Sequence, residues 1–510
     1  SGLQKLLKDG LLLFNYTGHG GTTALSDEKV LTQTDINQFT YTHLPVWVTA
    51  TCDFTRFDDL NTSAGEDVFL NKSSGGIALF TTVRVAYSRP NFPINDNVIR
   101  NLFERNNGRR RTLGEVMQAT KNTLSSVYKL GFCLIGDPAV KMAYPEFGMK
   151  VTTVNGQSVD GNSISFKALE KITVEGEVLD ASGQLVTDFT GIVNPTVKDS
   201  KVTVTCLKNS NKDDSPAFTF TDYPNTIFIG NDSVRNGKFS FTFTVPKDIS
   251  YSNLQGKMNL YAVDTESGNE AQGNFDNFIV GGTSDTAETD TIGPEIRALY
   301  LNDTTFVDGG QVNTTPYFVA ELWDKSGVNI TGSSVGHDMM LVIDESTVLS
   351  YNLNSYYELL LGEDGTGIVK FPIPALEPGK HTAEFWVWDI LNNSTVRTFT
   401  FEVVEGLKPF LFDVIATPGI AREQVTFHLM HNRPESRMRV GIMVYDLAGR
   451  QLWKHEESGT SGLFENYTVS WDLTSGGARM RPGVYIYRAA ISTDNSKDAT
   501  KARKFIILGE

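Results

Sequence analysis

Three continuous apolar runs, separated by amphipathic segments, dominate the first part of the chain. They are LLLFNYT at residues 11–17, PVWVTAT at 45–51 and GGIALFTT at 75–82. Runs without polar alternation are typical of parallel strands whose two faces are both buried. The pattern therefore predicts a parallel sheet with helices packed against it.

Two helix starts are marked by capping boxes, in which a hydroxyl residue stands three positions before a glutamate. Ser63 with Glu66 opens the segment SAGEDVFLNK, and Thr112 with Glu115 opens TLGEVMQATKNTL. A third helix is predicted over 92–104, where apolar residues recur at helical spacing. We therefore predict an α/β segment over the first 147 residues.

From residue 148 onward, apolar and polar residues alternate, as in KFSFTFTVP at 238–246. Such strands, separated by turns rich in Gly, Asn, Asp and Pro, are typical of antiparallel sandwiches. A polar stretch at 281–294 has the composition of a linker and marks a boundary. The predicted fold is a multidomain chain in which the α/β segment is followed by three antiparallel β-sandwich (Ig-like) domains, at 148–288, 289–406 and 407–510.

Charge and length exclude some classes of partner. The chain has 510 residues and a formal net charge of −15, which argues against nucleic acid, because phosphate binding needs a basic surface. No apolar run approaches the ~20 residues that span a bilayer, so membrane association would come through a partner or a modification. The start, SGLQKLLKDG, has neither an initiator Met nor a signal sequence. We expect a missing N-terminal part of the same protein.

Three cysteines are too few, and too far apart, for a disulfide framework or a metal knuckle. Cys133 and Cys206 lie in apolar strand patterns, so we expect them to be small buried hydrophobic residues. Cys52 differs because it directly follows a predicted strand.

A second candidate for chemistry is His19, in the stretch FNYTGHGGTTA at 14–24. Residues that follow parallel strands meet at the carboxyl edge of the sheet. If the strands before His19 and Cys52 are neighbours, thiol and imidazole can form a nucleophilic pair. The backbone N–H groups of the HGG stretch at 19–21, together with that of Cys52, can then stabilise an oxyanion.

Other interpretations stay open from these residues alone. A cysteine after a strand and a histidine in a glycine-rich turn are structural in many proteins, so catalysis and a structural role are equally favoured. No metal-ligand spacing accompanies either residue, and we expect no metal in the site. The other histidines are expected to be structural or solvated. The acidic turn at 264–276 could hold a structural Ca²⁺, although a solvated loop is the favoured interpretation, and no other cofactor is expected.

The phrases NYTGHGGTTALSDE, TATCDFTRFD and LIGDPAVKMAYP resemble the gingipain-type cysteine peptidases, a caspase-like family of clan CD. The resemblance implies that residues 1–147 are the C-terminal part of such a catalytic domain. It also implies that His19 and Cys52 are catalytic and that Gly20 and Cys52 form the oxyanion hole. The acid that orients the histidine would come from the missing part, and we assign this role to neither Asp53 nor Asp58.

Residues 407–510 resemble a C-terminal sorting domain of type IX secretion. The resemblance rests on VGIMVYDLAGRQLW, WDL, MRPGVYIYRA and the terminal KFIIL, while the usual opening Pro-Asn-Pro is replaced by ATPGIA. Such domains imply export through the periplasm and across the outer membrane of a Bacteroidetes-type bacterium.

A gingipain-like segment, a long β region and this ending together resemble the sortases of type IX secretion. That resemblance implies a cell-surface enzyme that removes sorting domains from exported proteins through a Cys thioester. It would transfer the new C-terminus to an amine of surface lipopolysaccharide, and it would be held at the outer membrane by the barrel protein PorV. The alternatives are a secreted gingipain-like endopeptidase that only hydrolyses and a surface binding protein without catalysis.

Overall fold

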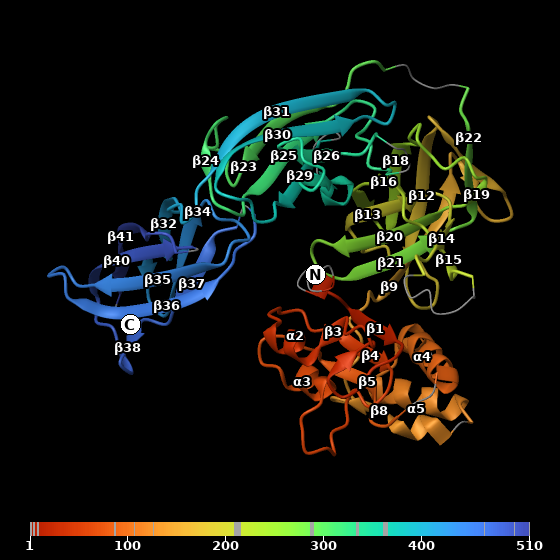
Figure 1. Ribbon diagram of the computed structural model, residues 1–510, viewed down its shortest axis with the longest axis horizontal. Coiled ribbons are helices and arrows are strands. Elements are labelled where there is room, and N and C mark those ends of the chain that lie inside the picture. Colours follow the sequence, from red (N-terminus) through yellow and green to blue (C-terminus); the bar gives the residue numbers. More distant parts are fainter. Residues whose placement is uncertain are drawn as a thin grey trace. The chain divides into compact units, whose positions relative to one another are not determined.

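The chain divides into two compact units, which are drawn in Figure 1. The computed structural model describes residues 3, 6, 7, 10–85, 88–106, 108–125, 127–208, 216–285, 290–332, 336–360, 366–463, 465–493 and 495–508. The first unit, here called the α/β unit, comprises residues 1–148, 178–186 and 267–272. The second, the β unit, comprises 149–177, 187–266 and 273–510.

The main sheet of the α/β unit has four strands in the order β1-β4-β5-β8. Strands β1, β4 and β5 are parallel, and β8 runs antiparallel to β5. The elements of this unit are β1 Leu13–Thr17, β2 Ala24–Leu25, β3 Leu31–Thr32, α2 Gln33–Gln38, β4 Val46–Ala50, α3 Ala64–Leu70, β5 Ala78–Thr82, α4 Ser88–Phe103, β6 Arg105–Asn106, β7 Arg109–Arg110, α5 Leu113–Thr123, a 3-10 helix Val127–Gly131 and β8 Phe132–Ile135.

Helices cover both faces of this sheet (Figure 1). Val48 and Phe80 lie on one face, in a core that also takes residues from α4 and α5. Trp47 and Leu79 lie on the other face, in a core with α2 and α3. Successive residues of a strand point to opposite faces, so a strand buried on both faces must be apolar throughout. This arrangement explains the unbroken apolar runs of the sequence.

The predicted capping boxes begin the helices as expected. The Thr112 N–H donates to the Glu115 carboxylate at 2.9 Å, and the Glu115 N–H donates to the Thr112 hydroxyl at 3.3 Å. At the start of α3, the Ser63 N–H donates to Glu66 at 2.8 Å. These bonds satisfy N–H groups that have no partner within the helix.

The β unit begins with a group of strands within residues 147–283. They form sheets of nine, three and two strands. Phe166 stacks on Phe278 with ring centroids 4.3 Å apart and meets Phe243 edge-on at 5.8 Å. The strands are β9 Phe147–Val154, β10 Gln157–Ser158, β11 Ile164–Ala168, β12 Lys171–Leu179, β13 Gly191–Lys198, β14 Val202–Thr205, β15 Thr219–Asp222, β16 Thr226–Ile229, β17 Asp232–Arg235, β18 Lys238–Thr244, β19 Leu254–Gln255, β20 Lys257–Asp264, β21 Glu270–Phe275 and β22 Phe278–Thr283.

A second group of strands, within 295–403, forms a four-stranded sheet, β23-β25-β29-β28, and a five-stranded sheet, β24-β31-β30-β26-β27. One core contains residues from both, including Phe318 and Phe385, whose ring centroids are 5.0 Å apart. The elements are β23 Glu295–Leu301, β24 Gln311–Val312, β25 Tyr317–Trp323, β26 Met340–Ile343, β27 Ser350–Asn352, a 3-10 helix Asn354–Tyr356, β28 Tyr357–Leu359, β29 Gly367–Pro372, β30 Gly379–Trp388 and β31 Ser394–Val403.

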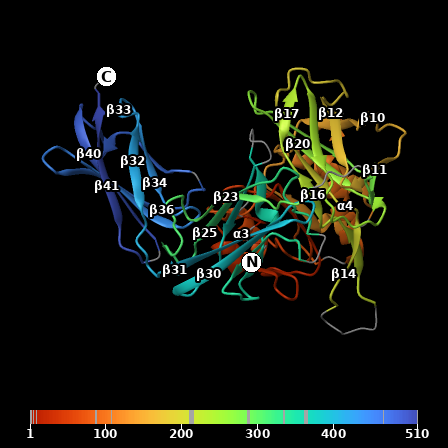
Figure 2. The same cartoon turned by 90° about the horizontal axis from the view of Figure 1, so that it is seen from above.

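The last group, within 411–507, has a three-stranded sheet, β32-β34-β37, and a five-stranded sheet, β33-β41-β40-β35-β36. Phe427 and Tyr487 bring the two sheets into one core, with ring centroids 4.9 Å apart. Strands β40 and β41 run side by side in Figures 1 and 2. The strands are β32 Leu411–Thr417, β33 Ile420–Ala421, β34 Val425–His431, β35 Met438–Tyr445, β36 Gln451–Gly459, β37 Tyr467–Trp471, β38 Thr474–Ser475, β39 Ala478–Arg479, β40 Gly483–Ser492 and β41 Ala499–Ile507.

The multidomain, β-rich character of the chain is confirmed, whereas the Ig-like sandwich arrangement and the boundaries at 148, 289 and 407 stay predictions. One expectation about the cysteines is wrong. Cys206 follows β14 and is exposed, because β14 pairs only with β15 and this two-stranded sheet has no fully buried face. Cys133 is partly buried on β8. Among the described helices, none is both long and apolar enough to cross a membrane.

Candidate functional site

The loops that carry His19 and Cys52 leave neighbouring strands at the same edge of the sheet. Strand β1 pairs in parallel with β4, and the last residues of the two strands, Thr17 and Ala50, stand opposite each other. His19 and Cys52 each follow two residues later. The carboxyl edge of a parallel sheet is the usual place for functional groups. The topology therefore brings imidazole and thiol to one edge.

Two of the three glycines around His19 are required by close approach. A Cβ on Gly18 would lie 2.7 Å from the Tyr16 hydroxyl, and one on Gly20 would overlap Oγ1 of Thr51. Gly21, in contrast, has open space where a side chain would stand. Because Thr51 immediately precedes Cys52, the Gly20 contact joins the two candidate loops directly.

Hydrogen bonds to backbone carbonyl groups hold the histidine loop in place. The His19 carbonyl accepts hydrogen bonds from the Tyr16 hydroxyl at 2.6 Å and the Ser26 N–H at 2.7 Å. The Gly21 N–H donates to the Ala24 carbonyl at 3.0 Å. Burial raises the pKa of Tyr16, so its hydroxyl stays a donor at neutral pH. Gly20 forms an isolated antiparallel bridge with Leu25, and within the described residues its N–H donates to no backbone carbonyl.

Hydrogen bonds join the cysteine loop to the last residue of β5 and to the segment that follows it. The Asp53 N–H donates to the Arg84 carbonyl at 3.3 Å, and the Thr55 N–H donates to the Thr82 carbonyl at 3.1 Å. Arg84 also donates to both carboxylate oxygens of Asp58, at 3.0 and 2.6 Å. This hydrogen bonding lowers the pKa of Asp58. Asp58 is therefore engaged by Arg84 rather than by the histidine.

The structure thus places the loops that carry His19, Gly20 and Cys52 at one edge of the sheet, with His19 exposed and Cys52 partly buried. Among the described residues, no acid forms a hydrogen bond with the His19 ring, and Asp58 is paired with Arg84. Two residues of the site escaped the sequence analysis. Arg84 comes two residues after β5, so the rule that singled out His19 and Cys52 could have found it. No pattern in the sequence singles out Thr51 as part of the site.

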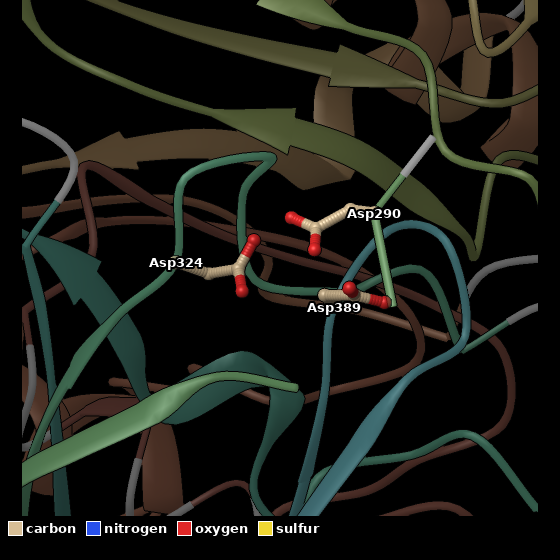
Figure 3. Close-up of side chains that lie close together, drawn as sticks. All are labelled: Asp290, Asp324 and Asp389. Carbon is tan, nitrogen blue, oxygen red and sulfur yellow. The ribbon is translucent and has the colours of Figure 1, made fainter. Parts of the chain in front are cut away.

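A separate cluster of carboxylates lies in the β unit. Asp290, Asp324 and Asp389 come from three segments, and their carboxylate oxygens lie within 4.8 Å of one another (Figure 3). Asp324 directly follows β25, and Asp389 directly follows β30. Carboxylates of this kind could hold Ca²⁺ or another hard cation. In the described part of the chain, this is the one group of three or more acidic, histidine or cysteine residues close enough to do so.

Burial makes the charges of this cluster unfavourable. Asp389 is fully buried and Asp324 is 7% exposed. Burial raises the pKa of Asp324 to about 6, and the charges of Asp389 and Asp290 add to the rise. The pKa of Asp389 is raised as well, chiefly by burial. The backbone N–H groups of Ser326 and Gly327 donate to the Asp324 carboxylate at 2.8 and 2.9 Å, which offsets part of the rise in its pKa.

Asp264, at the start of the acidic turn at 264–276, already accepts backbone hydrogen bonds. It is 6% exposed and accepts hydrogen bonds from the N–H groups of Thr190 at 3.0 Å and Glu266 at 2.9 Å. These bonds tie the start of the turn to the distant Thr190 and to the next residues of the turn itself. A Ca²⁺ site in this turn stays the weaker prediction.

Comparisons with known proteins place the first segment in a family. Residues 1–143 match the sequence model of peptidase family C25. The crystal structure of dimeric latent PorU from Porphyromonas gingivalis is 37% identical over 81% of this chain and 39% of that chain, with a TM-score of 0.35. The chain therefore spans about two fifths of the length of that protein. No curated protein sequence matches the chain.

Two gingipain structures also match. The Arg-specific cysteine proteinase gingipain R is 19% identical over 55% of this chain and 55% of that chain, with a TM-score of 0.27. The complex of the pro- and mature domains of RgpB from Porphyromonas gingivalis is 19% identical over 55% and 56%, with a TM-score of 0.26. The chain is therefore similar to PorU, and its residues 1–143 match the sequence model of peptidase family C25.

Proposed function

We propose that the chain belongs to a cell-surface cysteine peptidase and transpeptidase that acts through Cys52 and His19. The observation that carries this proposal is the contact between Gly20 and Thr51, which joins the two loops at the carboxyl edge of the sheet. The match of residues 1–143 to family C25 supports the nucleophile chemistry. The 37% identity to PorU supports the choice among family members.

The first half of the reaction forms a thioester. The Cys52 thiolate attacks the carbonyl carbon of the scissile bond, and the electron pair of the C=O bond moves to oxygen. The Gly20 and Cys52 N–H groups stabilise that oxyanion. When the tetrahedral intermediate collapses, the C–N bond breaks and His19 donates a proton to the departing amine. The released piece would be a sorting domain.

The second half decides between peptidase and sortase. Water that attacks the thioester gives a free acid, whereas a bound amine gives an amide, with His19 accepting the proton of the attacking group in both cases. Transfer to an amine of surface lipopolysaccharide requires the amine to be positioned at high effective concentration and water to be excluded. A sorting domain over residues 407–510 that docks on the barrel PorV would hold the enzyme at the outer membrane.

The acid that orients His19 would come from a part of the protein outside residues 1–510. This chain covers 39% of the PorU structure, which leaves ample length for further strands beside β1. In the present sheet, β1 is an edge strand. A partner acid at the carboxyl end of an adjoining strand would meet His19 by the same strand-end rule.

An assay with the intact protein tests the proposal. A substrate carrying a sorting domain is incubated with and without a small amine, and the products are identified by mass spectrometry. Amide at the new C-terminus supports the transpeptidase, and free acid alone supports the hydrolytic endopeptidase. Cys52→Ala and His19→Ala serve as variants. If both process the substrate like the wild type, the chain is a surface binding protein instead.

A further inference from the structure

Thr51 occupies the junction between the two candidate loops. It is the first residue after β4 and the last before Cys52, and its side chain is fully buried. Its hydroxyl lies where a side chain on Gly20 would stand, and its Cβ would be 3.3 Å from a Cβ at that position. On another side, the Ala24 carbonyl would be 3.2 Å away. Gly20 is therefore confined between Thr51 and its own hairpin.

Within the described residues, the buried Thr51 hydroxyl has no hydrogen-bond partner. The Thr82 hydroxyl at the end of β5 also has none, whereas three other buried threonine hydroxyls of this region are paired. Thr81 bonds both Thr49, at 2.7 Å, and Thr55, at 2.9 Å. A buried polar group without a partner lowers stability, so its presence needs an explanation.

We propose that Thr51 is a positioning residue for the peptidase reaction, whose hydroxyl sets how closely the Gly20 backbone approaches Cys52. The inference rests on the proposed function, because it assigns Gly20 and Cys52 to one oxyanion hole. An oxygen atom can approach a backbone carbon more closely than a methyl carbon can, since carbon atoms pack about 3.5–4.0 Å apart. The pair of a glycine and a hydroxyl therefore allows the shortest spacing between the loops.

The spacing matters because the two oxyanion donors come from different loops. The Gly20 N–H belongs to the histidine loop, and the Cys52 N–H belongs to the cysteine loop. The oxyanion forms only as the thiolate attacks. Displacing one of its donors therefore destabilises the transition state, while the affinity for the substrate stays unchanged. A shift of the Gly20 loop should consequently lower kcat without raising KM.

Thr51→Val in the intact protein tests this role, because valine keeps the shape of threonine and replaces its hydroxyl by a methyl group. We expect kcat for cleavage to fall by about 10- to 100-fold while KM stays within about 2-fold of the wild type. Valine removes an unpartnered hydroxyl but crowds Gly20, and these opposing effects should leave the melting temperature near that of the wild type. Thr51→Ser keeps the hydroxyl and should restore kcat to within about 3-fold of the wild type.

A matched control is Thr82→Val. Thr82 is also buried, also has a hydroxyl without a described partner, and ends the neighbouring strand β5, but it does not contact Gly20. This variant should keep the wild-type kcat. The rate of alkylation of Cys52 by iodoacetamide, mapped by mass spectrometry, should be the same in Thr51→Val and wild type, because alkylation of sulfur forms no oxyanion.

The outcomes distinguish a failure of the positioning role of Thr51 from a failure of the proposed function. Wild-type kcat in Thr51→Val overturns the positioning role, as does a Thr51→Ser variant as slow as Thr51→Val. Equal losses in Thr82→Val, or a matching fall in Cys52 alkylation, overturn it as well, because the effect would then not act through Gly20. If Cys52→Ala cleaves like the wild type, the proposed function itself fails. If Cys52→Ala is inactive, any failure belongs to Thr51 alone.

Discussion

His19 of the α/β unit and three histidines of the β unit stand in different surroundings. In the β unit, His337 pairs with Asp248 at 2.6 Å, His381 with Asp344 at 2.7 Å, and His431 with Ser461 at 2.8 Å. In the α/β unit, His19 is exposed, and the described residues offer its ring no hydrogen bond. An imidazole with a hydrogen-bond partner is held in place by it, whereas the His19 ring is exposed beyond the end of a strand.

The difference follows from the two kinds of sheet. Loops at one end of neighbouring parallel strands converge, so β1, β4 and β5 present His19, Cys52 and Arg84 at one edge. Antiparallel strands reverse direction at every turn, and their charged residues fix the turns locally. Reactivity is therefore expected at the edge of the α/β unit, and pH-dependent stability is expected in the β unit.

The largest effect should come from the nucleophile. Cys52→Ala removes the sulfur that forms the thioester, and we expect cleavage of a sorting-domain substrate to fall by more than about 10³-fold. Cys206→Ala is the control from the β unit, because Cys206 is also a free cysteine but follows β14, which pairs antiparallel with β15. Its kcat/KM should equal that of the wild type. A loss of kcat/KM as large as that of Cys52→Ala would contradict the expectation that only the α/β unit is reactive.

His19→Ala should lower kcat by about 10²- to 10⁴-fold, the usual contribution of a general acid–base group. The matching variant in the β unit is His337→Ala, which removes an imidazole bonded to Asp248. We expect this variant to keep the wild-type kcat and to melt at a lower temperature. Steady-state kinetics and thermal denaturation of both variants check the pair, and the reverse pattern would contradict it.

Two glycines in the same loop sharpen the comparison within the α/β unit. A methyl group on Gly20 overlaps the Thr51 hydroxyl, and Gly20→Ala should lower kcat by about 10²- to 10³-fold, as the loss of an oxyanion donor does. Gly21→Ala is the control because open space surrounds that position. It should retain kcat within about 3-fold of the wild type. Equal kcat values for the two variants would rule out the close approach as the cause.

Asp324→Asn tests buried charge in the β unit. The raised pKa, about 6, means that the folded protein keeps a proton that the unfolded chain loses above pH 3.8. The free energy of unfolding should therefore fall as the pH rises from about 4 to 6 and stay level above. With EDTA present, Asp324→Asn should remove this fall and gain up to about 3 kcal/mol at pH 8.

Asp290→Asn is the control for that variant. The Ile292 N–H and the Ser326 hydroxyl donate to Asp290 and lower its pKa, so its charged form is already stabilised. This variant should gain no stability at pH 8. Urea denaturation at several pH values distinguishes the two. A less stable Asp324→Asn protein at pH 8 would show that the buried charge is compensated in the folded state.

The smallest expected effect concerns His431, whose pKa burial lowers to about 4. Its Nδ1 accepts the Arg433 N–H at 3.0 Å, which requires the neutral ring. The unfolded chain takes up a proton near pH 6.5 and the folded protein does not, so stability should fall as the pH drops from 6.5 to 4. At pH 5 the loss should be about 2 kcal/mol. His431→Gln should show no such loss in denaturation curves.

Periodicity predicted much of the fold because burial on one or two faces leaves a direct trace in the sequence. The apolar runs became β1, β4 and β5, and the boxes at Ser63 and Thr112 begin α3 and α5. His19 and Cys52 could be singled out because each follows such a run. Cys206 was misjudged because alternation in VTVTCLK does not reveal whether a further sheet covers the strand.

Contacts between distant residues left no comparable trace. Thr51 matters through Gly20, which lies on another strand's loop, and no local pattern marks a hydroxyl that fills the space of a missing side chain. Asp290, Asp324 and Asp389 each stand in an ordinary turn sequence, and only the fold brings them together. Arg84 was within reach of the strand-end rule, since it follows β5 as Cys52 follows β4.

The most direct test is to trap the covalent intermediate. The intact protein is mixed with a sorting-domain substrate, quenched in acid within the first turnover, and digested for mass spectrometry. The account predicts a thioester between the N-terminal substrate fragment and Cys52, absent from Cys52→Ala. An acyl group on another side chain, or turnover without any acylated residue, would contradict it.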